Sequence, residues 1–241
     1  MKILSVSDLH YSLKQFDWLV RNAPRYELIV IAGDLMELGS YVDSDTQAAV
    51  LEQYFRKICS VTPMVVCSGN HDLVDEGDGT RTSEWLEDLD VTGLSVDLEC
   101  FDGHGFRILA LPWWESEEEK GRVATWLEEM AKSRGEKVEI WVHHAPPKGT
   151  KTSWSGKRDL GDSTLVEWIE DYLPNLVLTG HVHNAPYYPP EGAWIDRLGG
   201  TVVTNSGRQT GDVPATIEIE TEGGQVRWCG MEGCEDDSFA N

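Results

Sequence analysis

The stretch MVVCSGNHD, residues 64–72, places a cluster of polar side chains just after a short apolar run. Met64-Val65-Val66 is typical of a strand that is buried on both faces, as in parallel sheets. Gly69-Asn70-His71-Asp72 follows this run after two residues. Because open α/β sheets bind their ligands at the carboxyl ends of their strands, the stretch predicts an α/β fold with a site at that end of a sheet.

The same succession of an apolar run and a polar motif occurs at four other places. They are Ile3–Val6 before Asp8-Leu9-His10, Leu28–Ile31 before Gly33-Asp34, Ile140–Val142 before His143-His144, and Leu176–Leu178 before Gly180-His181-Val182-His183. Six of the seven histidines lie in these five motifs, which together offer enough ligands for two divalent cations. Imidazole, carboxylate and amide groups without a thiolate favour Mn²⁺, Fe or Zn²⁺ over Ca²⁺.

This ordered set resembles the calcineurin-like metallophosphoesterase superfamily, whose pattern is D-x-H, G-D, G-N-H-D/E, H and G-H-x-H, each after a strand. All five motifs are present here, from Asp8 to His183. The resemblance implies an α/β (α+β) fold, a four-layer αββα sandwich of two mixed β-sheets flanked by helices. It also implies two metal ions, one held by Asp8, His10, Asp34 and His183, the other by Asp34, Asn70, His143 and His181. Asp34 would bridge the two ions.

The resemblance further implies the chemistry of a phosphoester hydrolase. A hydroxide that bridges two cations would attack phosphorus, while the cations neutralise the charge that develops on the phosphate oxygens. His71 would stabilise the transition state and protonate the leaving oxygen. Asp72 would accept a hydrogen bond from the other ring nitrogen of His71 and fix its tautomer.

The substrate class is read from details around the motifs. His143-His144-Ala145-Pro146-Pro147 is similar to the H-H-x-P region of class III cyclic-nucleotide phosphodiesterases, with Glu37 where that group commonly has Asp. Asn205-Ser206-Gly207 is similar to an N-x-G turn of small bacterial phosphoesterases. We therefore expect a phosphodiesterase that acts on a small or nucleotide-type substrate.

Three alternatives remain open. They are a phosphomonoesterase, a nuclease that stacks short single strands on Trp113, Trp114 or Trp154, and a non-catalytic binding scaffold, as in a retromer subunit of this fold. A scaffold is disfavoured, because its sign would be the loss of a metal-ligand histidine and every motif position is filled here.

The charge of the chain is strongly asymmetric. The formal net charge is −22, which argues against long nucleic acid as a partner, since Lys and Arg contacts to phosphates dominate such binding. Residues 145–158 carry +4 and no acid, which leaves −26 for the rest. Two interpretations stay open for Lys148, Lys151, Lys157 and Arg158: they hold the phosphate of a small substrate, or they belong to a solvated surface loop.

Apolar spacing predicts helices around Leu51–Ile58, Val123–Met130 and Leu165–Leu173, the last capped by Asp162 or Ser163 and ended by Pro174. After Gly180 we expect short strands, which are Tyr187-Tyr188, Trp194-Ile195, Thr201–Val203, Ala215–Ile219 and Val226–Trp228.

Residues 1–230 are expected to form a single metallophosphoesterase domain, and residues 231–241 a disordered acidic tail. The five dispersed cysteines suit reduced thiols better than a disulfide framework, with the alternative that Cys229 and Cys234 pair or hold a metal. We expect a cytoplasmic location and no membrane contact, because no apolar stretch approaches the ~20 residues that span a bilayer and no secretory signal is visible.

Overall fold

The computed structural model describes residues 1–75, 77 and 79–239. Its helices are α1 (Leu13–Asn22), α2 (Ser44–Cys59), α3 (Glu84–Glu87), α4 (Glu117–Lys132) and α5 (Ser163–Tyr172), with short 3-10 turns at Ala23–Arg25, Lys151–Ser153 and Ala185–Tyr187. The helices expected around Leu51, Val123 and Leu165 are confirmed as α2, α4 and α5. The Asp162 carboxylate caps α5 by accepting from Leu165 N at 2.8 Å, and the helix stops before Pro174.

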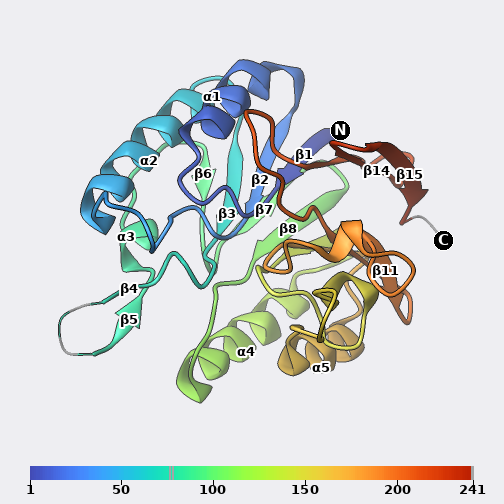
Figure 1. The fold of residues 1–241 in the computed structure, drawn as a ribbon. Coiled ribbons are helices and arrows are strands. Elements are labelled where there is room, and N and C mark those ends of the chain that lie inside the picture. The colour runs from blue at the N-terminus through green and yellow to red at the C-terminus, as the bar shows by residue number, and fades with distance from the viewer. Residues whose placement is uncertain (76, 78, 240–241) are drawn as a thin grey trace.

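The strands form two large mixed sheets (Figure 1). The first has the order β15-β14-β13-β1-β2-β3-β6, and the second β11-β12-β10-β9-β8-β7. Strands of the first sheet are β1 (Lys2–Val6), β2 (Leu28–Ala32), β3 (Met64–Cys67), β6 (Leu94–Ser95), β13 (Thr216–Glu220), β14 (Gln225–Gly230) and β15 (Gly233–Ser238). Strands of the second are β7 (Cys100–Asp102), β8 (Phe106–Ala110), β9 (Val138–Val142), β10 (Leu176–Thr179), β11 (Ile195–Leu198) and β12 (Thr201–Asn205). A small hairpin pairs β4 (Val74–Asp75) with β5 (Arg81–Thr82).

Alternate residues of each central strand enter different parts of the core, which produces four layers. In β2, Leu28 and Val30 pack between the two sheets, whereas Ile29 and Ile31 face α1 and α2. In β9, Ile140 and Val142 lie between the sheets, and Trp141 packs toward α4 and α5. Both faces of these strands are buried, which explains their continuous apolar runs.

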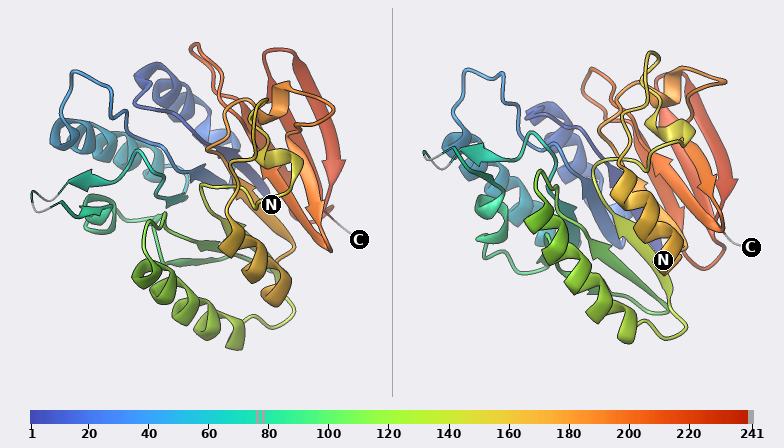
Figure 2. Two further views of the ribbon diagram at one scale, coloured as in Figure 1. Left: turned by 60° about the horizontal axis from the view of Figure 1, so that its bottom comes forward. Right: turned by 90° about the horizontal axis from the view of Figure 1, so that it is seen from below.

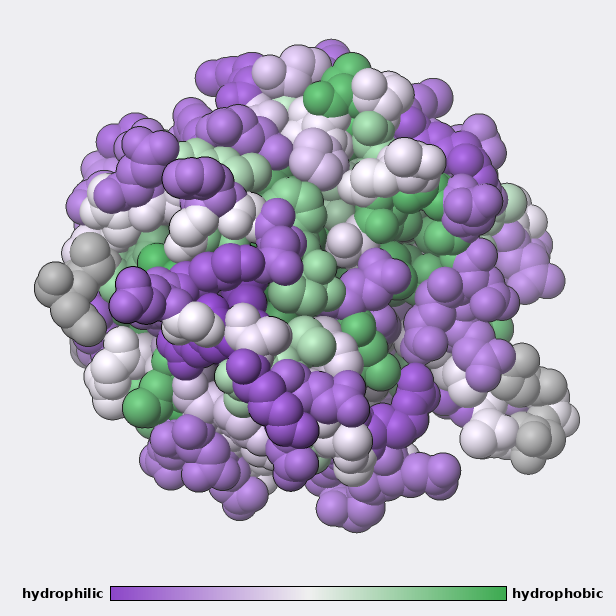
Figure 3. Space-filling view, turned by 180° about the vertical axis from the view of Figure 1, so that it is seen from behind, coloured by the Kyte–Doolittle hydropathy of each residue, from purple (hydrophilic) through white to green (hydrophobic). Residues whose placement is uncertain are grey.

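The helices cover the outer faces of the sheet pair. α1 and α2 lie along one side of the molecule, and α4 and α5 along the opposite side (Figure 2). This arrangement confirms the expected αββα sandwich with helices outside. The face seen from behind carries mainly hydrophilic side chains, in keeping with the high negative charge (Figure 3).

Three expectations for the second half of the chain are wrong. Tyr187 belongs to a 3-10 turn instead of a strand, because Pro186 in Ala185–Tyr187 cannot donate to a sheet ladder. Residues 233–238, expected to be disordered, form β15 and pair with β14. Cys229 and Cys234 lie opposite one another in that pair and form a disulfide, so these two cysteines are not the expected reduced thiols. Residues 240 and 241 of the predicted tail lie outside the described residues.

Among the described residues, no helix is both long and apolar enough to cross a bilayer.

Candidate metal centre

The five polar motifs meet where the central strands of the two sheets end. The first sheet supplies the residues after β1, β2 and β3, and the second supplies those after β9 and β10. Within this arrangement Asp8, His10, Asp34 and His183 each offer a ligand atom, and these four atoms lie within 4.8 Å of one another. These are the four residues expected at the first metal ion.

The imidazole and carboxylate atoms of this group lie close to one another. His183 Nε2 lies 3.2 Å from Asp8 Oδ1, and His10 Nε2 lies 3.4 Å from Asp34 Oδ2. The two imidazole Nε2 atoms of His10 and His183 are 3.1 Å apart. Two carboxylates and two imidazoles that converge in this way form a donor set suited to a transition metal ion.

A second group adjoins the first and shares Asp34 with it. His144 Nε2 lies 3.2 Å from Asp34 Oδ2, the same oxygen that faces His10. His181 Nδ1 lies 2.9 Å from Asn70 Oδ1, and the rings of His144 and His181 are 5.2 Å apart. His144 Nε2 is buried and has no hydrogen-bond partner among the described residues. An orphaned imidazole nitrogen beside a shared carboxylate fits a second cation.

His144, rather than the expected His143, contacts the carboxylates of the centre. His143 stacks on Trp114 with ring centroids 3.9 Å apart, and its Nδ1 lies 3.3 Å from Leu111 O. Side chains of β9 point alternately to its two faces, and this alternation continues through His143 and His144. His144 therefore lies on the same side as Val142, between the sheets, and His143 on the same side as Trp141, toward the helices. Sequence spacing could not tell the two faces apart.

The Asp72 side chain also differs from expectation. Its Oδ1 accepts from Leu35 N at 2.8 Å and Met36 N at 2.9 Å, and its Oδ2 accepts from Gly69 N at 2.8 Å. The carboxylate therefore ties the loop after β2 to the loop after β3 and does not meet the His71 ring. Its expected role toward the tautomer of His71 is not supported by this geometry.

Glu37, which the sequence reasoning did not assign to the site, is the carboxylate beside His71. Its Oε1 lies 3.7 Å from His71 Nδ1, and its Oε2 lies 3.5 Å from His10 Nδ1. A carboxylate on the ring nitrogen that faces away from the ligand cluster commonly orients a metal-binding histidine. His71 itself is partly exposed at the rim of the centre.

The backbone of the ligand loops adopts an uncommon conformation. Asp8, His10, Asp34 and His181 all have positive φ angles between 44° and 64°. Residues other than glycine seldom adopt such angles, which occur in strained, functional parts of a chain. Gly69 permits the crowding, because a Cβ atom there would lie 2.4 Å from Asp34 Oδ1.

Charge and burial set the protonation of the centre. Burial lowers the pKa of His144, but the adjacent Asp34 and Asp8 carboxylates outweigh it and raise that pKa to about 9. Although burial raises the pKa of Asp34, the nearby His144 and His10 hold it well below its usual range. A cation at His144 must therefore compete with a proton, as at other metal sites.

The cations of the predicted basic loop lie on the surface of the protein. Lys148, Lys151, Lys157 and Arg158 are exposed, and among the described residues no hydrogen bond or ion pair joins their side chains to the ligand residues. A hollow of about 320 Å³ in this loop is lined by Lys151 and Trp154, but also by Asp159 and Glu191. The role of the four cations in substrate binding stays a prediction.

Trp113 and Trp114 differ in how accessible they are. Trp114 is buried, stacks on His143 and donates from Nε1 to Asp162 at 2.9 Å, so its ring is not free to stack a base. Trp113 is partly exposed, and its ring centroid lies 5.3 Å from that of His181.

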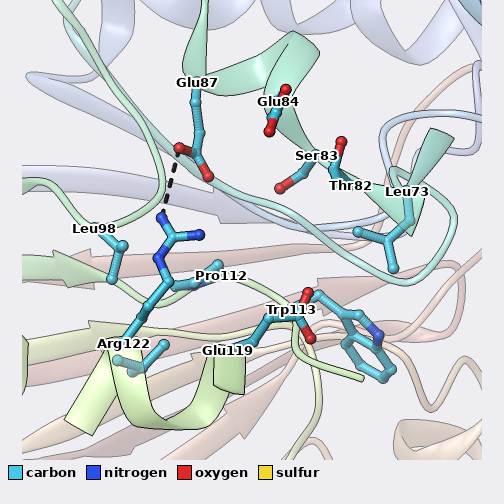
Figure 4. A pocket seen from close by; sticks show the side chains of 11 residues that line it. Leu73, Thr82, Ser83, Glu84, Glu87, Leu98, Pro112, Trp113, Glu119 and Arg122 are labelled. Atoms are coloured by element: carbon cyan, nitrogen blue, oxygen red, sulfur yellow. Dashed lines mark ion pairs between the residues drawn. The ribbon is translucent and has the colours of Figure 1, made fainter. Parts of the chain in front are cut away.

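Trp113 also lines a cavity of about 160 Å³ between α3 and α4 (Figure 4). Glu84 and Glu87 from α3 face this cavity, and Glu87 pairs with Arg122 of α4 at 3.9 Å. Glu119 adds a third carboxylate to the lining. With three acids and one arginine, the cavity does not suit a phosphate.

Comparisons with known proteins agree with this architecture. The family model of the calcineurin-like phosphoesterases matches residues 1–185 of the sequence. No curated protein matches the chain. The fold is similar to that of the protein TT1561 from Thermus thermophilus, at 16% identity and a TM-score of 0.60, with 99% of each chain covered.

Two further solved structures share the fold. Purple acid phosphatase PPD1 from yellow lupin (Lupinus luteus) is 14% identical with a TM-score of 0.55, and the match covers 99% of this chain and 51% of that one. GAP50, described as the anchor in the inner membrane complex of Plasmodium, is 10% identical with a TM-score of 0.60, and the match covers 100% of this chain and 89% of that one. These identities bear on the fold alone. The family model matches more than half of this chain, and the chain therefore belongs to the calcineurin-like phosphoesterase family.

Proposed function

We propose that the protein is a dinuclear-metal-dependent phosphodiesterase that acts on a small or nucleotide-type substrate. The observation that carries this proposal is the position of Asp34 Oδ2, which lies 3.4 Å from His10 Nε2 and 3.2 Å from His144 Nε2. One carboxylate oxygen that faces two separate imidazoles supports the proposal that Asp34 would be shared by two cations. Dinuclear hydrolases use such a shared ligand to hold their ions roughly 3.5–4 Å apart.

The proposed ligands divide into two sets. Asp8, His10, Asp34 and His183 would hold one ion, and Asp34, Asn70, His144 and His181 the other. When bound, two divalent cations supply hydroxide near neutral pH and neutralise charge on phosphate oxygens. The identity of the ions follows from supply as much as from the donors, and Mn²⁺, Fe or Zn²⁺ all suit this set.

His71 would donate a proton to the leaving oxygen of the ester. Its ring is partly exposed and lies 4.6 Å from the ring of His10. His71 lies within reach of His10 and Glu37 and is not one of the four ligand residues that gather around Asp34. Glu37 would orient this ring through Nδ1, the role that we first assigned to Asp72. Asp72 would support catalysis indirectly, by joining the two loops that carry Asp34 and Asn70.

A nuclease on short single strands is a second candidate, favoured by one observation. The partly exposed Trp113 ring lies beside His181 and could stack a base next to the centre. Hydrolysis of a phosphomonoester would use the same ligands.

A panel of substrates tests the proposal and separates these candidates. The protein loaded with Mn²⁺ would be assayed on bis-p-nitrophenyl phosphate, p-nitrophenyl phosphate, cyclic nucleotides and short oligonucleotides. We expect the diester to be hydrolysed faster than the monoester, and a chelator to abolish both rates. Hydrolysis that favours the monoester would identify a phosphatase, and cleavage of oligonucleotides alone would identify a nuclease. No hydrolysis of any substrate by the metal-loaded protein would contradict the proposal.

A further inference from the structure

Arg208 is held next to the candidate metal centre by a turn that is built against the Gly180–His183 loop. The Asn205 amide donates to Gly180 O at 2.9 Å, and its Oδ1 accepts from Gly207 N at 2.7 Å. The next residue, Arg208, donates from its backbone N to His183 O at 3.0 Å. Gly207 has a φ of +66°, and a Cβ atom there would lie 2.7 Å from Pro186. The backbone of Arg208 is therefore fixed relative to the ligand His183.

The Arg208 guanidinium reaches toward Glu37, on the side of the centre where His71 lies. Its Nη2 is 3.9 Å from Glu37 Oε2, the same oxygen that is 3.5 Å from His10 Nδ1. Glu37 Oε1 is 3.7 Å from His71 Nδ1. Arg208 thus shares one carboxylate with a proposed metal ligand and with the proposed proton donor.

The ion pair between Arg208 and Glu37 is loose enough to leave the guanidinium available to bind a second anion. A separation of 3.9 Å is longer than a hydrogen bond, and the Arg208 side chain is 33% exposed. A guanidinium presents several N–H donors in a planar fork that matches the oxygens of a phosphate. In a chain with a net charge of −22, a cation at the centre also offsets repulsion of an anionic substrate.

We propose that Arg208 binds a non-bridging phosphate oxygen of the substrate, and that Glu37 holds the guanidinium in position until the phosphate arrives. This inference rests on the proposed phosphoesterase function. Arg208 is a better candidate for the first cationic contact of the phosphate than the exposed basic loop around Lys151. Its guanidinium lies beside Glu37, whereas no hydrogen bond or ion pair among the described residues joins the four loop cations to the ligand residues. Arg81, a further cation near the centre, donates to the backbone oxygen of Asn70.

Binding of inorganic phosphate to the Mn²⁺-loaded protein tests the inference without requiring turnover. Calorimetry would compare the wild type with Arg208→Ala and Arg208→Lys. A matched control is Lys14→Ala. Lys14 lies on α1 and forms an ion pair at 3.0 Å with Asp212, which belongs to the loop that carries Arg208, and within the described part of the chain Lys14 has no ion pair with a residue of the centre. The Lys151→Ala variant tests the basic loop in the same assay.

We expect Arg208→Ala to weaken phosphate binding about tenfold or more, since hydrogen bonds to charged groups are the stronger ones. Arg208→Lys should retain part of the affinity, because a lysine keeps the charge and loses the fork. Lys14→Ala should bind as the wild type does, and Lys151→Ala should lose less affinity than Arg208→Ala. In the diesterase assay the loss in Arg208→Ala should appear mainly in KM.

Two results would overturn the inference. One is equal phosphate affinity in Arg208→Ala and Lys14→Ala. The other is loss of bound Mn²⁺ from Arg208→Ala, measured by elemental analysis, because the residue would then support the ligands instead of the substrate. A wild type that binds phosphate but hydrolyses no ester would contradict the proposed function alone, and the comparison of variants would still decide the role of Arg208.

Discussion

Asp34 and Glu37 lie at opposite edges of the His10 ring, each next to one of its two nitrogens. Asp34 Oδ2 is 3.4 Å from His10 Nε2, and Glu37 Oε2 is 3.5 Å from His10 Nδ1. Both carboxylates come from the loop after β2, so that single loop carries the proposed shared ligand and a carboxylate that lies beside a second proposed ligand. The sequence marked Asp34 through its Gly-Asp motif, whereas nothing in the spacing of Glu37 indicated a contact with His10.

The choice between His143 and His144 gives a direct prediction at the residue scale. His144→Ala should lower the bound Mn²⁺ from two ions per chain to about one, because it removes an imidazole that faces Asp34. His143→Ala should keep both ions, since its ring stacks on Trp114 away from the carboxylates. Elemental analysis of the two variants measures this difference. A loss of metal in His143→Ala with full occupancy in His144→Ala would restore the assignment made from the sequence.

Substitution of His71 should separate metal binding from proton donation. His71→Ala should keep both ions and lose turnover, and general acid catalysis typically contributes about 10²–10⁴-fold. A nucleoside phosphodiester, which has a poor leaving group, should slow most, whereas a p-nitrophenyl ester hardly needs the proton. The rates on both substrates and the metal content form the measurement. Equal slowing of the two substrates would show that His71 acts as a general electrostatic stabiliser.

Asp97 makes a prediction for stability against pH. Its buried carboxylate accepts from Ser68 N at 2.9 Å, and burial raises its pKa to about 7. A folded-state pKa above the unfolded value of about 4 stabilises the fold at low pH, and that contribution is lost as pH rises through about 7. Asp97→Asn should therefore lose less stability than the wild type between pH 5 and pH 8. Urea unfolding at both pH values tests this, and equal losses would contradict it.

Among the strands, those with a clear apolar pattern could be predicted from the sequence, and those without one could not. The continuous apolar runs predicted β1, β2, β3, β9 and β10, because these strands are buried on both faces. β15 was missed, since the sequence GCEDDS offers no apolar face and its pairing with β14 comes from tertiary context. For the same reason the sequence favoured reduced thiols over the alternative of a Cys229–Cys234 pair, because only the pairing of β14 with β15 sets the two cysteines opposite one another.

The β14–β15 hairpin should depend on this disulfide more than the metal centre does. A closed loop as short as the one between Cys229 and Cys234 is worth about 2 kcal/mol in the chain-entropy account. The double variant Cys229→Ser with Cys234→Ser should lose up to about that much unfolding free energy while it keeps its metal content. Urea unfolding with and without a reductant measures the effect. A wild type whose stability is unchanged by the reductant would contradict it.

At the scale of the whole molecule, the centre depends on the docking of two sheets. Asp8, Asp34 and Asn70 follow strands of the first sheet, and His144, His181 and His183 follow strands of the second. The order of motifs predicted that these residues meet, because carboxyl ends of parallel strands gather at one end of each sheet. It could not predict which side chain of a pair faces the partner sheet, because that depends on how the layers pack.

A dinuclear centre in this protein requires that two cations share Asp34. Titration of the metal-free protein with Mn²⁺, followed by the hydrolysis rate of bis-p-nitrophenyl phosphate, tests it most directly. We predict that the rate rises to a plateau at two ions per chain. We also predict that Asp34→Asn, which damages both sites, shows almost no rate, and that Asp8→Asn still binds about one ion. Full hydrolysis after exhaustive chelation, or equal metal content in Asp34→Asn and Asp8→Asn, would contradict the claim.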